Sequence, residues 1–116
     1  MNYYAVPGLK KRKRFGRRLR TGLKISPDKI IKIITKHFSI SIESIQKKDR
    51  SQNIVYARRM ICYFLYKYSL MSLTEIGKIF GGQDHTTILY HIKTLNDLRW
   101  AYPQIEAEIL IIDNKL

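Results

Sequence analysis

The chain is poor in cysteine and in long apolar runs, and each shortage excludes a class of protein. A single cysteine, Cys62, excludes an internal disulfide framework and a zinc knuckle built on cysteines. No apolar run approaches the roughly 18 residues that span a bilayer, and the first residues lack the apolar stretch of a secretory signal. The G-x-x-x-x-G-K-[ST] loop of nucleotide hydrolases is also missing from the sequence.

Acidic residues are scarce as well, at 9 against 22 lysines and arginines, which gives a formal net charge of +13. With 45% hydrophobic residues, the chain is too apolar for a wholly disordered polycation, and 116 residues fit one domain. Nine of the basic residues lie within residues 9–24, which hold no acid, so the rest of the chain carries only +4. We therefore expect a basic, flexible arm over residues 1–24 and a globular domain over residues 25–116.

The arm is expected to bind the phosphates of DNA or RNA. Two alternatives stay open: a solvated tail that aids solubility, and a segment that binds anionic lipid through a ragged apolar stripe. The residues assigned to polyanion binding are Lys10, Lys11, Arg12, Lys13, Arg14, Arg17, Arg18 and Arg20.

The globular part has the residue spacing of helices and not of strands. Ser26-Pro27-Asp28 predicts a helix start, with a capping hydroxyl, a proline at the first helical position and an acid in the first turn. A strand over the long apolar segment 53–68 is disfavoured, because strict alternation is absent and the segment is too long. The expected elements are a helix from Pro27 through Phe38, a short capped turn at 41–45, a polar loop at 46–52, a buried helix at 53–68 and a last helix from Pro103.

Between the helix at 53–68 and the last helix, the sequence predicts two further helices joined by a glycine turn. Ser72 and Glu75 fit a capping box, and Gly81-Gly82 ends the first helix because glycine adopts the left-handed conformation of a sharp turn. Asp84 is placed to cap the second helix. This arrangement is a helix-turn-helix, in which the second helix can enter a major groove with its first turn on the base edges.

The residues Ser72 to Thr87, SLTEIGKIFGGQDHTT, resemble the signature of the C-terminal DNA-binding domain of the bacterial replication initiator DnaA. The similarity continues upstream through the segments 45–51 and 57–60 and covers about residues 25–100. It implies an all-α helix-turn-helix bundle of the DnaA C-terminal, Trp-repressor-like type, without the ATPase domain of a full initiator. It also implies sequence-specific recognition of double-stranded DNA at sites like those of replication origins.

The resemblance assigns roles residue by residue. Arg50 matches an arginine in the minor groove. The residues that match major-groove positions are Asp84, His85 and Thr86, with Leu73 and Thr74 beside the groove. The residues that match positions at the DNA backbone or in the basic loop are Lys48, Arg58, Arg59, Gln83 and Thr87.

Three departures from the family pattern lower the positive charge or change a contact. Gln83 replaces an arginine, Thr74 replaces a proline, and Asp49 and Gln52 occupy loop positions that are commonly basic. Fewer phosphate contacts would make binding less dependent on salt. The arm is expected to compensate with nonspecific attraction.

The remaining expectations concern partners and chemistry. We expect no enzymatic activity, no metal and no cofactor, binding to DNA as a monomer, and a bacterial, phage or mobile-element protein in the cytoplasm at the nucleoid. The sequence identifies no protein partner. The alternatives are an RNA-binding or nonspecific nucleic-acid-binding protein that uses the arm, a metal-dependent nuclease and a protein-binding adaptor.

Overall fold

The computed structural model describes residues 25–47 and 50–116. The predicted arm and Lys48 lie outside the described residues, so their expected roles stay predictions. The described ranges form helices and, within these ranges, no strand. The helices are α1 (Pro27–Phe38), α2 (Ile42–Gln46), α3 (Gln52–Tyr68), α4 (Leu73–Ile79), α5 (His85–Ala101) and α6 (Pro103–Lys115).

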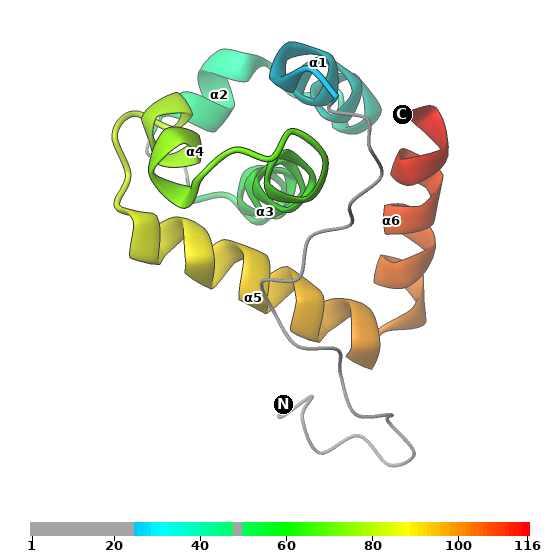
Figure 1. The fold of residues 1–116 in the computed structure, drawn as a ribbon. Coiled ribbons are helices and arrows are strands. Elements are labelled where there is room, and N and C mark those ends of the chain that lie inside the picture. Colours follow the sequence, from blue (N-terminus) through cyan, green and yellow to red (C-terminus); the bar gives the residue numbers. More distant parts are fainter. Residues whose placement is uncertain (1–24, 48–49) are drawn as a thin grey trace.

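The long helix α3 is the centre of the fold, with the other helices around it (Figure 1). It packs mainly against α1 and α5, and also against α2 and α4. Met60, Phe64 and Leu65 of α3 are fully buried, and so is Cys62. The predicted central buried helix is therefore confirmed, and Cys62 is a core residue whose thiol pKa is raised by burial.

Apolar side chains of the outer helices also lie in the core. Ile30 and Ile34 of α1 are completely buried, as is Ile112 of α6. Leu89 and Leu98 of α5 are half-buried. The helix α6 packs against α5 and α1, on the right-hand edge of Figure 1. It thus closes the bundle on the side opposite α4.

The start of α1 differs in one detail from the prediction. Pro27 occupies the first helical position and Asp28 lies in the first turn, as expected. The Ser26 side chain, however, makes no capping hydrogen bond, so the predicted role of its hydroxyl is wrong. The helix still begins there because proline presets the backbone angle and the acid complements the helix dipole.

Candidate nucleic-acid interface

The helix α4 begins with the predicted capping box. The Ser72 hydroxyl accepts a hydrogen bond from the Glu75 amide at 3.1 Å, and the Glu75 carboxylate accepts one from the Ser72 amide at 3.1 Å. Two amides at the helix start are thereby satisfied. Ile76, on the inner face of α4, is fully buried. The cap and this buried contact set where α4 lies against α5.

The turn between α4 and α5 is built around the backbone of Gly77. Its carbonyl oxygen accepts hydrogen bonds from the amides of Gly82 at 3.0 Å and Gln83 at 2.9 Å. Gly81 and Gly82 have φ angles of 78° and 82°, the left-handed conformation predicted for them. A Cβ on Gly77 would lie 2.1 Å from the carbonyl oxygen of Gln83. The turn therefore needs glycine at 77 as well as at 81 and 82.

Gly77 was not among the residues that we singled out from the sequence. A glycine inside an otherwise helical pattern is a signal of close packing, and that signal was present. The signal from one helical glycine is weaker than that from a Gly-Gly pair, because the sequence does not show which part of the backbone packs against the glycine.

The first turn of α5 presents an exposed row of small polar side chains. Asp84 holds the N-cap position, and His85, Thr86 and Thr87 follow it, all exposed. One carboxylate oxygen of Asp84 accepts the Thr86 hydroxyl at 2.7 Å, and the other lies 2.9 Å from Nδ1 of His85. The Thr86 hydrogen bond is the main cause that lowers the pKa of Asp84. The carboxylate thus orients the two side chains beside it.

The capping role predicted for the Asp84 side chain is wrong, because the carboxylate makes no capping hydrogen bond to the first turn of α5. The carboxylate is used instead by Thr86 and His85. The amides in the first turn of the helix therefore make no capping hydrogen bond to this side chain. Such amides, together with the helix dipole, favour an approaching phosphate.

The inner face of α5 fixes the orientation of this row. Ile88, Ile92 and Leu95 are buried against the core. Tyr90 is 61% exposed, and Lys93 is also exposed, on the outer side. Because these faces are opposed around one rigid helix, the residues at its start cannot rotate away from solvent.

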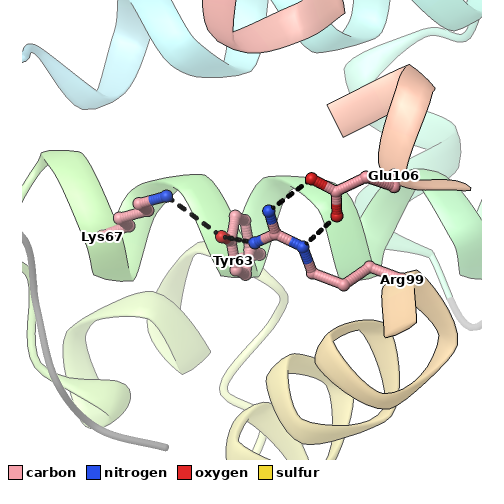
Figure 2. A network of polar contacts seen from close by, with 4 residues as sticks. All are labelled: Tyr63, Lys67, Arg99 and Glu106. Carbon is pink, nitrogen blue, oxygen red and sulfur yellow. Dashed lines mark hydrogen bonds and ion pairs between the residues drawn. The ribbon is translucent and has the colours of Figure 1, made fainter. Parts of the chain in front are cut away.

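The C-terminal half of α5 is held by a polar network (Figure 2). Arg99 binds Glu106 of α6 through two hydrogen bonds, Nε to Oε2 at 2.5 Å and Nη2 to Oε1 at 2.8 Å. A third nitrogen of Arg99 donates to the Tyr63 hydroxyl of α3 at 2.6 Å, and Lys67 lies 3.1 Å from the same hydroxyl. The network ties α5 to α3 and to α6 at the end remote from the exposed row.

Arg50 and Arg58 lie close in sequence but in different environments. Arg50 is exposed in the connection between α2 and α3, where a side chain is free to reach a groove. Arg58 is only 5% exposed. Its guanidinium donates to the carbonyl oxygens of Ile45 at 2.7 Å, of Ser44 at 3.4 Å, and of Lys47. The contact with the DNA backbone that the resemblance implies for Arg58 stays a prediction, whereas its bonds within the chain are observed.

Arg59 of α3 and His91 of α5 are both half-buried, and the charge of Arg59 acts on the His91 imidazole. Burial is the main cause that lowers the pKa of His91, to about 4, and the positive charges of Arg59 and Arg58 add to it. Within the described part of the chain, Nε of Arg59 and Nδ1 of His91 have no hydrogen-bond partner. His91 lies one helical turn beyond Thr87, so both are on the same side of α5.

The other predicted site residues flank the same surface. Thr74 is exposed at the start of α4, and Leu73 beside it is half-buried against the core. Gln83 is half-buried in the turn, and its backbone amide donates to the Gly77 carbonyl. The residues predicted for the major groove thus lie at the starts of α4 and α5, and Arg50 lies just before α3.

No three or more His, Cys, Asp and Glu side chains in the described ranges are grouped so that they could hold a metal ion. None of the helices in residues 25–47 and 50–116 is long and apolar enough to cross a membrane.

Comparison with known proteins identifies the same family that the residues Ser72 to Thr87 resemble. The family described as "Bacterial dnaA protein helix-turn-helix" matches residues 27–95. The chromosomal replication initiator protein DnaA of Buchnera aphidicola is 37% identical over 87 residues, which are 75% of this chain and 20% of that protein. That of Chloroflexus aurantiacus is 28% identical over 93 residues, which are 80% of this chain and 19% of that protein.

The chain spans about a fifth of the length of these relatives. The matched residues include all of α1 to α4 and the exposed start of α5. The chain therefore belongs to the bacterial DnaA helix-turn-helix family.

Proposed function

We propose that this chain binds double-stranded DNA sequence-specifically, with the start of α5 in the major groove. The observation that carries the proposal is the exposed row Asp84 to Thr87, which a buried helix face and a three-glycine turn hold rigidly at the surface. A first turn raised in this way can touch base edges while the rest of the domain stays outside the groove.

The side chains of the row suit base readout. The hydroxyl and methyl groups of Thr86 can meet a base edge and a thymine methyl, and an imidazole can donate or accept. The carboxylate of Asp84 can accept from a cytosine amine, and it already orients Thr86 and His85. Preorganisation of this kind reduces the conformational entropy that binding must remove.

Arg50 is proposed to read the adjacent minor groove. It is exposed on the connection that precedes α3, and an arginine is attracted by the negative potential of a narrow, AT-rich minor groove. Thr87, Arg59 and Gln83 are proposed to meet the DNA backbone. The arm and Lys48 are proposed to add attraction that does not depend on sequence.

The recognised sites are proposed to resemble those of replication origins, because the similar proteins are named as chromosomal replication initiators. Because such sites lie in the bacterial chromosome, we also propose that the chain acts at the nucleoid.

Selection from a pool of randomised duplexes tests the proposal. The full chain should recover a defined sequence with an AT-rich segment beside it. His85→Ala or Thr86→Ala should then weaken binding to that duplex by about 1–3 kcal/mol and change binding to random DNA little.

Two outcomes would contradict the proposal. One is a recovered pool without any consensus. The other is structured RNA that outcompetes the duplex at equal salt, which would favour an RNA-binding function through the arm.

A further inference from the structure

We propose that Arg58 and Gln46 are positioning residues that fix the start of α3, with Arg50 just before it, relative to the turn before α5. The proposal rests on the proposed function, because it concerns how two groove-reading elements keep one spacing. It assigns to Arg58 a role inside the protein in place of a direct contact with DNA.

Arg58 joins α3 to the end of α2. The carbonyl oxygens that accept from its guanidinium belong to Ser44, Ile45 and Lys47, which lie in and just beyond the last turn of α2. Carbonyls at a helix end lack partners within the helix, so an external donor is needed when they are buried. The planar guanidinium supplies several donors at once, which an ammonium group on a flexible stem does not reproduce.

Lys47 is the residue at which the connection to α3 leaves α2. Because Arg58 holds the Lys47 carbonyl, it fixes the end of α2 against α3, the helix that begins just after Arg50. Arg58 itself lies on the most buried helix of the described residues. The end of α2 is therefore anchored to the core.

Gln46 joins the same end of α2 to the end of α4. Its side-chain amide donates to the Ile79 carbonyl at 3.2 Å. The Gln46 carbonyl lies close to the turn as well, since a Cβ built on Gly81 would be 3.5 Å from it. The end of α2 thus contacts the last carbonyl of α4, immediately before the glycine turn that leads into α5.

These two contacts link the reading elements through the end of α2. Arg50 precedes α3, which Arg58 joins to the end of α2, and Asp84 to Thr86 follow the end of α4, which Gln46 joins to the same place. Reading two grooves of one duplex requires that both elements keep a fixed separation. The hydrogen bonds of Arg58 and Gln46 fix that separation from within the protein, without contact with DNA.

A double-mutant cycle with Arg50→Ala tests the proposal. The probe is the short duplex that the wild-type chain recovers from a randomised pool, and the variants are Arg58→Lys and Gln46→Ala in the full chain. Each should weaken binding about tenfold in the wild-type background and less than about twofold in the Arg50→Ala background. Gln104→Ala, which removes an exposed amide on α6, is the matched control and should change nothing.

A second probe separates loss of position from loss of fold. Replacing an A·T pair of the AT-rich segment by I·C keeps the minor-groove pattern without a guanine amino group, whereas G·C introduces that group. Wild type should prefer I·C over G·C at this pair, and Arg58→Lys and Gln46→Ala should lose the preference. A merely destabilised domain would bind all duplexes less well and keep the preference, and this result would overturn the proposal.

Amide hydrogen exchange of the free chain gives an outcome that does not depend on DNA recognition. Arg58→Lys and Gln46→Ala should both speed exchange at the hydrogen-bonded amides of Val55, Gly82 and Gln83 and leave the α6 amides unchanged. If the wild-type chain recovers no consensus but exchange changes as expected, the proposed function fails and the positioning role stands. If the Val55 amide exchanges at the wild-type rate in both variants, the positioning role is refuted.

Discussion

At the residue scale, Gly77 decides whether the turn between α4 and α5 can close. Gly77→Ala would place a Cβ 2.1 Å from a backbone oxygen of Gln83, a contact that requires the turn to move. We expect a loss of about 1–3 kcal/mol in the free energy of unfolding. Affinity for the selected duplex should fall by more than this loss of fold explains, since the start of α5 moves with the turn.

Urea denaturation and binding titrations measure the two effects of Gly77→Ala. Lys78→Ala, at an exposed neighbouring position of α4, is the control for loss of stability and should lie within about 0.5 kcal/mol of wild type. A Gly77→Ala protein as stable as the control, with wild-type affinity, would contradict the description of the turn.

His91 makes stability depend on pH. Its pKa is about 4 in the folded chain and about 6.5 when unfolded, so between these values the unfolded state binds more protons. The free energy of unfolding should therefore fall as the pH drops through this window. Between pH 7 and pH 5 we expect a loss on the order of 1 kcal/mol, reduced from the full shift because the ring is partly exposed.

Denaturant titrations at the two pH values measure this loss for wild type and for His91→Asn. The free energy of unfolding of the asparagine variant should differ less between pH 7 and pH 5, since the variant lacks the imidazole that titrates in this range. An unchanged difference would mean that His91 is not the group responsible.

At the element scale, the contact between Arg99 and Glu106 holds α6 against α5. The hydrogen bonds from Arg99 are the main cause that lowers the pKa of Glu106, so the pair adds stability above the ordinary carboxyl range and loses it as the pH falls through the lowered pKa. Glu106→Gln should lower the free energy of unfolding at pH 7 by about 0.5–1 kcal/mol, a small value because the pair is partly exposed.

The effect of Glu106→Gln should disappear at a pH where Glu106 is protonated in both states. Binding to DNA should change little, because the pair lies at the end of α5 remote from the exposed row. Equal destabilisation of the variant at pH 7 and at pH 2 would contradict the role of the charge.

The elements differ in how much of them could be predicted from the sequence. The start of α4 and the glycine turn were predictable, because the bonds of a capping box and the left-handed angles of glycine are local properties of Ser72, Glu75, Gly81 and Gly82. The burial of Arg58 was not, since an arginine in a helix is usually at the surface and only the packing of α2 on α3 brings three carbonyls to it. The use of the Asp84 carboxylate by Thr86 was missed because a capping bond and a side-chain bond compete for the same oxygens.

At the scale of the whole molecule, charge and specificity are expected to lie in different parts of the chain. Residues 9–24 carry nine of the 22 basic residues, whereas the exposed row that is proposed to read bases has no lysine or arginine. Removal of residues 1–24 should weaken binding to the selected and random duplexes by similar factors. It should also flatten the dependence of affinity on salt, because each lost phosphate contact removes about 0.9 from the slope.

Titrations over a range of salt concentrations measure this separation. A truncated chain that loses the preference for the selected sequence while keeping its salt slope would contradict it, since the arm would then read bases and not phosphates.

The most direct test of the central claim is the affinity ratio between the selected duplex and a scrambled duplex of the same composition at one salt concentration. Sequence-specific DNA binders commonly show ratios of about 10³ or more. We predict that the full chain strongly prefers the selected duplex and that His85→Ala removes about 10- to 100-fold of this preference. A ratio close to one for the wild-type chain would contradict the claim that the start of α5 reads a DNA sequence.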